Sequence, residues 1–120
     1  MSVPHMTLLG ISNCDTVRKA RKWLEKNNIS HDFQDVRETP LNATILQGWA
    51  AQVGWEVLFN KRSTSYRGLE QSVKDNLNEQ SALTLIIEHP TLMKRPVLVN
   101  SDQVVAVGFN EKLYQPLTSG

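Results

Sequence analysis

The sequence predicts an α/β fold with a mixed sheet, formed as one domain by a chain of 120 residues. Two observations support this prediction. A strand-like run, a helix-like run and a second strand-like run follow one another within the first 36 residues. Two further strand-like runs and a short helix end the chain, whereas the stretch between these halves has mainly helical patterns.

The first half predicts a strand–helix–strand unit. Met6 to Ile11 is a short, mostly apolar run and is expected to be a buried strand, and Ser30 to Val36 alternates apolar and polar side chains as strands do. Between them, a helix is expected from Thr16 to Lys26, ended by Asn27-Asn28. A helix that connects two strands of one sheet is a crossover, so the two strands are predicted to be parallel. The apolar face of this helix consists of Val17, Ala20, Trp23 and Leu24.

The middle of the chain, about residues 41–90, predicts a helical insertion. Its first helix has an apolar face between Leu41 and Val53 that stops at Gly54. A short apolar piece follows, and the polar stretch Asn60 to Gly68 is expected to be a loop. Further helices are expected at about Gln71 to Leu77 and Glu79 to Glu88, before His89-Pro90.

The second half predicts an antiparallel hairpin and a final helix. Pro96 to Val99 and Gln103 to Val107 are expected strands, joined by the turn residues 100–102. Asn110 is a good N-cap for a last helix that reaches about Leu117. The order βαβ, helical insertion, ββα is that of a thioredoxin-like fold, with residues 1–120 as a single domain.

Composition narrows the range of partners and compartments. Thirteen Lys and Arg against twelve Asp and Glu give a net charge of +1, which does not favour nucleic acid or a membrane surface as the partner. No run is apolar and long enough to span a bilayer, and the N-terminus lacks a signal-peptide pattern. Met1 to His5 is interpreted as a loose start or a cloning remnant. A single cysteine excludes an internal disulfide and fits a reducing compartment, so we expect a cytoplasmic protein. The expected oligomeric state is a monomer.

The single cysteine, Cys14, falls where the first strand ends and the first helix begins. Backbone N–H groups and the positive end of the helix dipole favour a thiolate there, and Arg18 one turn later could add a positive charge. A lone cysteine can also be a small buried apolar residue. Polar neighbours Asn13, Asp15 and Thr16 favour the reactive thiol.

The chemistry of Cys14 must use an external thiol. A dithiol motif would carry a second cysteine three residues later, where this chain has Val17, so any disulfide formed at Cys14 is intermolecular. No metal site is expected, because His5, His31 and His89 are far apart and show no ligand spacing around Cys14.

Two basic segments are further candidates. Lys94-Arg95-Pro96 enters a strand with a proline, which implies an edge, a bulge or a cis peptide bond; the sequence leaves cis and trans open. Arg62 lies in the polar loop, where a guanidinium could pair with an oxyanion or a carboxylate, or simply be solvated.

Together these segments resemble the ArsC/Spx family, and most of all its YffB-like branch. The resemblance extends from Met6 to about Leu117. The segments that carry it are Gly10 to Arg21, Trp49 to Trp55, Leu58 to Arg62, Lys94-Arg95-Pro96 and Val107-Gly108-Phe109.

The resemblance implies a thioredoxin-like fold and a catalytic thiolate at Cys14 that works with glutathione. Arg62 and Arg95 match two of the arginines with which the family's glutathione-linked arsenate reductases hold the oxyanion. The third has no match, because the stretch 108–110 is Gly-Phe-Asn. This difference favours a YffB-like thiol reductase over arsenate reduction. The Spx branch implies a third function, a regulator that binds RNA polymerase, although Val17 removes its two-cysteine switch.

The sequence therefore predicts a glutathione-dependent thiol–disulfide oxidoreductase that has no bound cofactor and uses glutathione as its reducing co-substrate. Cys14 is the expected nucleophile, Arg95 its charged neighbour and Arg62 a glutathione contact. Asp15 and Thr16 are expected to cap the helix. The expected substrate-binding residues are Asn13, Asp15, Thr16, Arg18, Lys94 and Pro96.

Overall fold

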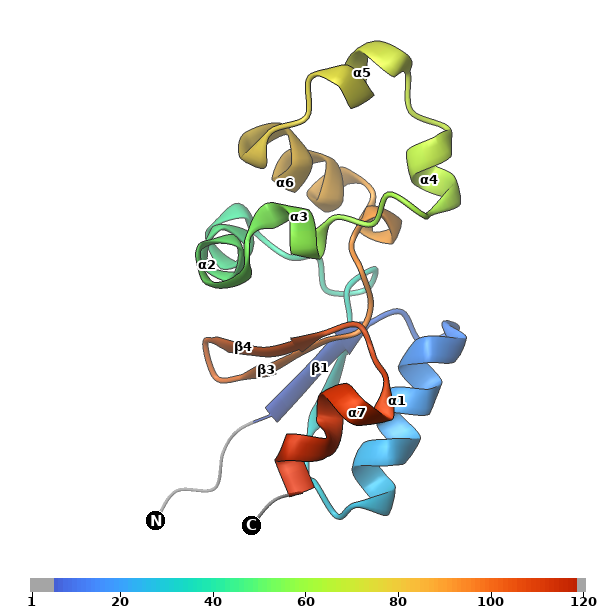
Figure 1. Ribbon diagram of the computed structural model, residues 1–120, viewed down its shortest axis with the longest axis vertical. Coiled ribbons are helices and arrows are strands. Elements are labelled where there is room, and N and C mark those ends of the chain that lie inside the picture. The colour runs from blue at the N-terminus through green and yellow to red at the C-terminus, as the bar shows by residue number, and fades with distance from the viewer. Residues whose placement is uncertain (1–5, 119–120) are drawn as a thin grey trace. The chain divides into compact units, whose positions relative to one another are not determined.

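The computed structural model describes residues 6–118 and divides the chain into two compact units (Figure 1). The sheet unit consists of residues 6–39 and 95–118, and the helical unit of residues 40–94. The helical unit corresponds to the helical insertion that the sequence predicts at about residues 41–90. The predicted loose start at Met1 to His5 lies outside the described residues.

The sheet unit contains one four-stranded mixed sheet in the order β2-β1-β3-β4. The central strand β1 (Met6–Gly10) pairs in parallel with β2 (Asp32–Asp35) and antiparallel with β3 (Val97–Asn100). Strand β4 (Gln103–Val107) pairs antiparallel with β3 at the edge. The mixed α/β sheet and the thioredoxin-like order of its elements are therefore as predicted.

Helices α1 (Asp15–Lys26) and α7 (Glu111–Tyr114) pack on one face of this sheet (Figure 1). Helix α1 buries the apolar stripe that its sequence predicts, and α7 continues into the 3-10 turn η2 (Gln115–Thr118). The core cluster on this face consists of Leu8, Val17, Ala20, Leu24, Leu98, Ala106 and Tyr114. Burial of these apolar side chains is the main stabilisation of the sheet unit.

The helical unit consists of five helices and a 3-10 turn. They are α2 (Ala43–Val53), α3 (Trp55–Leu58), α4 (Thr64–Arg67), α5 (Gln71–Asp75), α6 (Glu79–Glu88) and η1 (Pro90–Leu92). Side-chain caps fix several starts: Asn42 accepts from Ile45 N–H, and Asn78 and Ser81 form a reciprocal capping box. Gly54 separates α2 from α3 with φ 89°, a conformation that glycine adopts without strain.

The structure differs from the predicted loop Asn60 to Gly68 and from the predicted hairpin turn 100–102. The stretch Asn60 to Gly68, predicted to be a loop, contains helix α4, which begins because the Ser63 hydroxyl accepts the Tyr66 N–H. In the hairpin, Asn100 belongs to β3 and pairs with Gln103, so the turn consists only of Ser101 and Asp102. Ser101 has φ 55°, the left-handed conformation that a tight hairpin turn requires.

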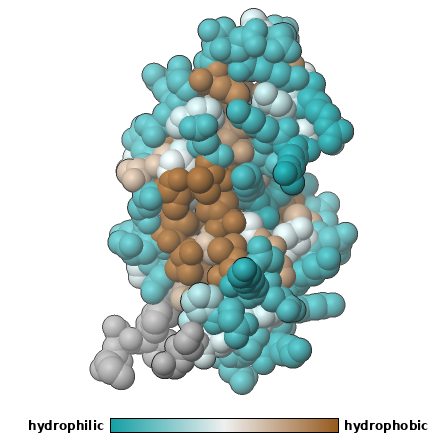
Figure 2. Space-filling view, in the orientation of Figure 1, coloured by the Kyte–Doolittle hydropathy of each residue, from teal (hydrophilic) through white to brown (hydrophobic). Residues whose placement is uncertain are grey.

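The surface of the sheet unit is largely hydrophilic around α1, and apolar side chains gather over β3 and β4 on the face shown in Figure 2. Val105 on β4 is 38% exposed. No helix among residues 6–118 is long and apolar enough to cross a membrane.

Candidate functional site

Cys14 is the N-cap residue of helix α1. Its backbone N–H donates to Ile11 O at 3.0 Å, and its carbonyl accepts from Arg18 N–H at 3.0 Å. The thiol is free and half-buried, and it packs against the core cluster. The thiol therefore lies at the start of α1, against the apolar core of the sheet unit.

The predicted capping by Asp15 and Thr16 is wrong. The helix begins at Asp15, one residue earlier than predicted, so the N-cap position falls on Cys14, whose side chain makes no capping hydrogen bond. Asp15 is instead paired with Arg18 within the first turn, and both side chains are exposed. This pairing offsets the positive charge that Arg18 was expected to add beside the thiol.

Arg95 and Pro96 come directly before β3 and lie at the same end of the central strands as the loop that carries Cys14. Leu9 pairs with Val97, so Pro96 continues β3 beside the carboxyl end of β1. The Arg95–Pro96 peptide bond is cis, which answers the question that the sequence left open. Pro96 is buried, and its carbonyl accepts the Gly108 N–H at 2.8 Å.

The guanidinium of Arg95 has two buried nitrogens, Nε and Nη1, that have no hydrogen-bond partner among the described residues. A guanidinium stays charged in proteins and prefers to donate pairs of hydrogen bonds to a carboxylate or an oxyanion. Leaving such donors buried and unpaired is costly. The arrangement is chemically suited to receive an anionic ligand.

Sequence reasoning missed Asp35, which ends β2 beside the cysteine loop. Its carboxylate is 8% exposed, and it accepts the Ser12 N–H at 3.0 Å and the Arg37 N–H at 2.8 Å. The guanidinium of Arg37 donates to the Asn13 side chain at 3.0 Å. The sequence signal is positional: parallel strands bring their carboxyl ends together, so polar residues after β1 and after β2 meet.

The hydrogen bond from Ser12 N–H is the main reason that the pKa of Asp35 lies below its ordinary value of 3.8. Burial acts in the opposite direction, and the N–H and the charge of Arg37 lower the pKa further. Asp35 is therefore an ionised, hydrogen-bonded carboxylate at neutral pH.

Arg62 and Lys94 lie in the helical unit, where they line one cavity of about 380 Å³ together with Glu56, Phe59, Asn60 and Lys61. Arg62 is exposed, and its N–H donates to the Asn60 side chain at 3.0 Å. The structure thus groups the predicted site residues in two sets. The sheet unit contains Asn13, Cys14, Asp15, Thr16, Arg18, Arg95 and Pro96, and the helical unit contains Arg62 and Lys94.

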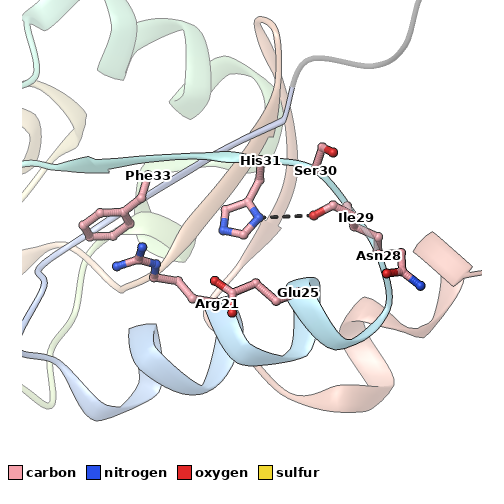
Figure 3. A pocket seen from close by; sticks show the side chains of 7 residues that line it. All are labelled: Arg21, Glu25, Asn28, Ile29, Ser30, His31 and Phe33. Atoms are coloured by element: carbon pink, nitrogen blue, oxygen red, sulfur yellow. Dashed lines mark hydrogen bonds between the residues drawn. The ribbon is translucent and has the colours of Figure 1, made fainter.

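Another hollow, of about 460 Å³, lies at the opposite end of α1 from Cys14 (Figure 3). The guanidinium of Arg21 lies 4.4 Å from the centre of the Phe33 ring, and His31 Nδ1 is 3.2 Å from Ile29 O. None of the predicted site residues lines this hollow. Between residues 6 and 118, no three His, Cys, Asp or Glu side chains group closely enough to hold a metal ion.

Comparison with known proteins gives the family. The model of the ArsC family matches residues 9–117, nearly the whole chain. The chain belongs to the ArsC family. Its fold is accordingly the thioredoxin-like fold of that family, as the order of strands and helices also indicates.

Relatives of this ArsC-family chain include proteins of different description. This chain is 46% identical over 110 residues to an uncharacterized protein from Haemophilus influenzae, and the matched residues are 92% of this chain and 96% of that protein. It is 32% identical over 108 residues to the global transcriptional regulator Spx from Streptococcus agalactiae, with coverage of 88% and 77%.

Solved structures support the YffB-like relation. A YffB protein matches with a TM-score of 0.88 and 33% identity, over 95% of this chain and 99% of that one. An arsenate reductase related protein from Brucella melitensis matches with a TM-score of 0.79 and 35% identity, over 100% and 99%. This ArsC-family chain thus belongs to a group related to arsenate reductases that also contains Spx regulators.

Proposed function

We propose that this chain is a glutathione-dependent thiol–disulfide oxidoreductase of YffB-like type, acting as a cytoplasmic monomer. One observation carries the proposal most directly. The single cysteine occupies the start of α1 at the sheet edge that also carries Arg95, whose buried guanidinium nitrogens are unpaired. A thiolate-stabilising position beside a group that attracts anions suits a substrate such as glutathione, which carries carboxylates.

The proposed reaction has two exchange steps. The Cys14 thiolate attacks the glutathione sulfur of a glutathionylated thiol, which forms a Cys14–glutathione disulfide and releases the substrate as a thiolate that takes a proton from water. Reduced glutathione, as its thiolate, then attacks this mixed disulfide. Oxidised glutathione leaves and the Cys14 thiolate is restored. In the net reaction the substrate sulfur is reduced and the sulfur of one free glutathione is oxidised, whereas the sulfur of the glutathione that was already bound to the substrate stays in a disulfide.

Several residues keep their expected roles within this proposal. Arg95 pairs with the incoming anion, and Pro96 aligns the substrate backbone at the sheet edge. Arg62 is proposed to help hold glutathione, and Lys94 is a proposed substrate contact. Asn13, Asp15, Thr16 and Arg18 complete the proposed substrate contacts around the start of α1.

Replacement of Cys14 by Ser tests the proposal. Serine has nearly the same size but is a far weaker nucleophile at neutral pH, so Cys14→Ser should abolish turnover and leave the fold intact. Turnover is measured with a glutathionylated peptide, reduced glutathione, NADPH and glutathione reductase, and the fold by circular dichroism. A variant that is folded and still turns over would refute the mechanism.

Arsenate reduction with glutathione is the alternative within the family. It is favoured by the unpaired Arg95 guanidinium and by the similarity to an arsenate reductase related protein. The segment after β4 argues against arsenate reduction, because it supplies no third arginine to hold the oxyanion. Gly108 in this segment has φ 81°, and the centre of the Phe109 ring lies 4.8 Å from that of the Tyr114 ring. The same assay with arsenate in place of the peptide distinguishes the two substrates.

A regulator that binds RNA polymerase is the second alternative, and the similarity to Spx supports it. Such binding would not need the thiol, because Val17 already excludes a two-cysteine switch. Purified RNA polymerase retained equally by the wild type and by Cys14→Ser, without turnover by the wild type, would favour this alternative over the enzyme.

A further inference from the structure

We propose that Asp35 and Arg37 are positioning residues for the loop 11–14, which presents Cys14. The inference rests on the proposed function, since it assigns these two residues a part in the reactivity of that thiol. Neither residue is expected to touch the substrate or the reacting sulfur atoms.

The evidence is a pair of connections from the end of β2 to the two residues that precede Cys14. The Asp35 carboxylate accepts the Ser12 N–H at 3.0 Å, and the Arg37 guanidinium donates to the Asn13 side chain at 3.0 Å. Asp35 also accepts the Arg37 N–H at 2.8 Å, which fixes the backbone from which the Arg37 side chain extends. Both residues before the cysteine are therefore tied to the neighbouring strand.

The connections rest on a rigid base. Gly10, which ends β1, pairs in register with Asp35, and the Gly10 carbonyl accepts the Val36 N–H at 2.9 Å. The Asp35 side chain is 8% exposed, so little water competes for the Ser12 N–H. Loop 11–14 also closes on itself, because the Cys14 N–H donates to Ile11 O at 3.0 Å.

This arrangement restricts the orientation of Cys14. A loop held at two consecutive residues has few backbone conformations left, so the thiol stays at the first turn of α1. A loop that is released lets the thiol leave the start of α1, the position on which its proposed reactivity depends. Release of the loop should therefore slow the attack by Cys14, although the fold of the sheet is kept.

The test is the rate of alkylation of Cys14 by iodoacetamide in the full chain, measured without glutathione. In Asp35→Asn an amide N–H₂ replaces one acceptor oxygen, and in Arg37→Gln the bond to Asn13 is lost while the buried carboxylate remains. Each variant should react about three- to tenfold more slowly than the wild type. Glu38→Gln is the matched control, since it removes one exposed carboxylate charge nearby and should keep the wild-type rate.

A double-mutant cycle provides a readout that a merely structural role would not change. The cycle compares the alkylation rates of Asn13→Ala, of Arg37→Gln and of the variant that carries both substitutions. If Arg37 acts through Asn13, the double variant loses no more rate than either single variant, and the two losses do not multiply. Rates in Asp35→Asn and Arg37→Gln that equal or exceed the wild-type rate, with only the melting temperature lowered, would overturn the inference. If Asp35→Asn does not fold, the exposed Arg37 supplies the decisive variant.

The positioning role and the proposed function can be refuted separately. The ratio of variant to wild-type rates judges the positioning role, whether or not glutathione is the reductant. Glutathione-coupled turnover by the wild type judges the proposed function. Wild-type turnover with unchanged variant rates would refute only the positioning role, and slower variants without any turnover would refute only the reductase.

Discussion

At the residue scale, the proposed site includes a half-buried thiol and a guanidinium whose buried nitrogens lack partners in the described part of the chain. The unpaired nitrogens of Arg95 are the more unusual feature, because folded proteins pair nearly all buried donors. Buried donors that are left unpaired at a functional site generally lower the stability of the fold, and they are kept because they bind a ligand.

Replacement of Arg95 by Met should therefore separate stability from activity. Methionine keeps an unbranched side chain but removes the charge, so we expect Arg95→Met to be more stable than the wild type by about 1 kcal/mol and to reduce a glutathionylated peptide more slowly. Urea unfolding and the coupled assay measure the two effects. Lys112→Met, at an exposed position on α7, is the control and should change neither. An Arg95→Met variant with unchanged turnover would contradict the proposed anion contact.

The lowered pKa of Asp35 predicts a specific acid dependence of stability. The folded chain releases this proton more readily than the unfolded chain, so the carboxylate stabilises the fold fully above its ordinary pKa of 3.8 and progressively loses this effect as the pH falls below it. The unfolding free energy of the wild type should thus fall more steeply than that of Asp35→Asn between about pH 4 and pH 3. Urea unfolding of both at several pH values tests this, and parallel curves would contradict it.

At the element scale, the approach of strand β1 to helix α1 positions the cysteine loop. Gly10 ends the strand, and a Cβ atom there would lie only 2.6 Å from Val17 Cγ2 in the first turns of the helix. Glycine is required at this point by the close approach, because a methyl group would push the helix start away from the strand.

Replacement of two different glycines by alanine should consequently change the free energy of unfolding in opposite directions. Gly10→Ala should lower the unfolding free energy by about 1–3 kcal/mol through overpacking. Gly48→Ala, within α2 and with no atom near the added Cβ, should raise it by up to about 1 kcal/mol through helix propensity. Denaturant unfolding measures both. A Gly10→Ala variant as stable as the wild type would show that the helix can shift without cost.

The regular elements could be predicted because their apolar residues have a clear period, as Val17, Ala20 and Leu24 do in α1. Helix α4 was missed because its start depends on one hydroxyl, that of Ser63, and not on an apolar face. The importance of Asp35 was hidden because, within the expected strand Ser30 to Val36, it is one of several polar residues that alternate with apolar ones; only the register of β1 with β2 brings it to Ser12. The unpaired state of Arg95 depends on packing, which no local pattern indicates.

At the scale of the whole molecule, family membership and the single cysteine each restrict the range of functions that this chain can have. Membership of the ArsC family relates the chain to arsenate reductases and to Spx regulators. The single cysteine, with Val17 three residues later, restricts any redox chemistry to an exchange with an external thiol. The proposal of a glutathione-linked reductase combines these two restrictions, and its central claim is that Cys14 is an activated nucleophile.

The most direct test of that claim is the alkylation rate of wild-type Cys14 by iodoacetamide at about pH 7, compared with that of glutathione itself. A free thiol is only a few per cent thiolate at this pH, whereas the start of a helix favours the thiolate. Because a more stable thiolate is also a weaker nucleophile, we expect a modest gain in alkylation rate, at least about threefold over glutathione. A rate equal to or below that of glutathione would refute an activated thiol and would favour a binding protein of the Spx kind.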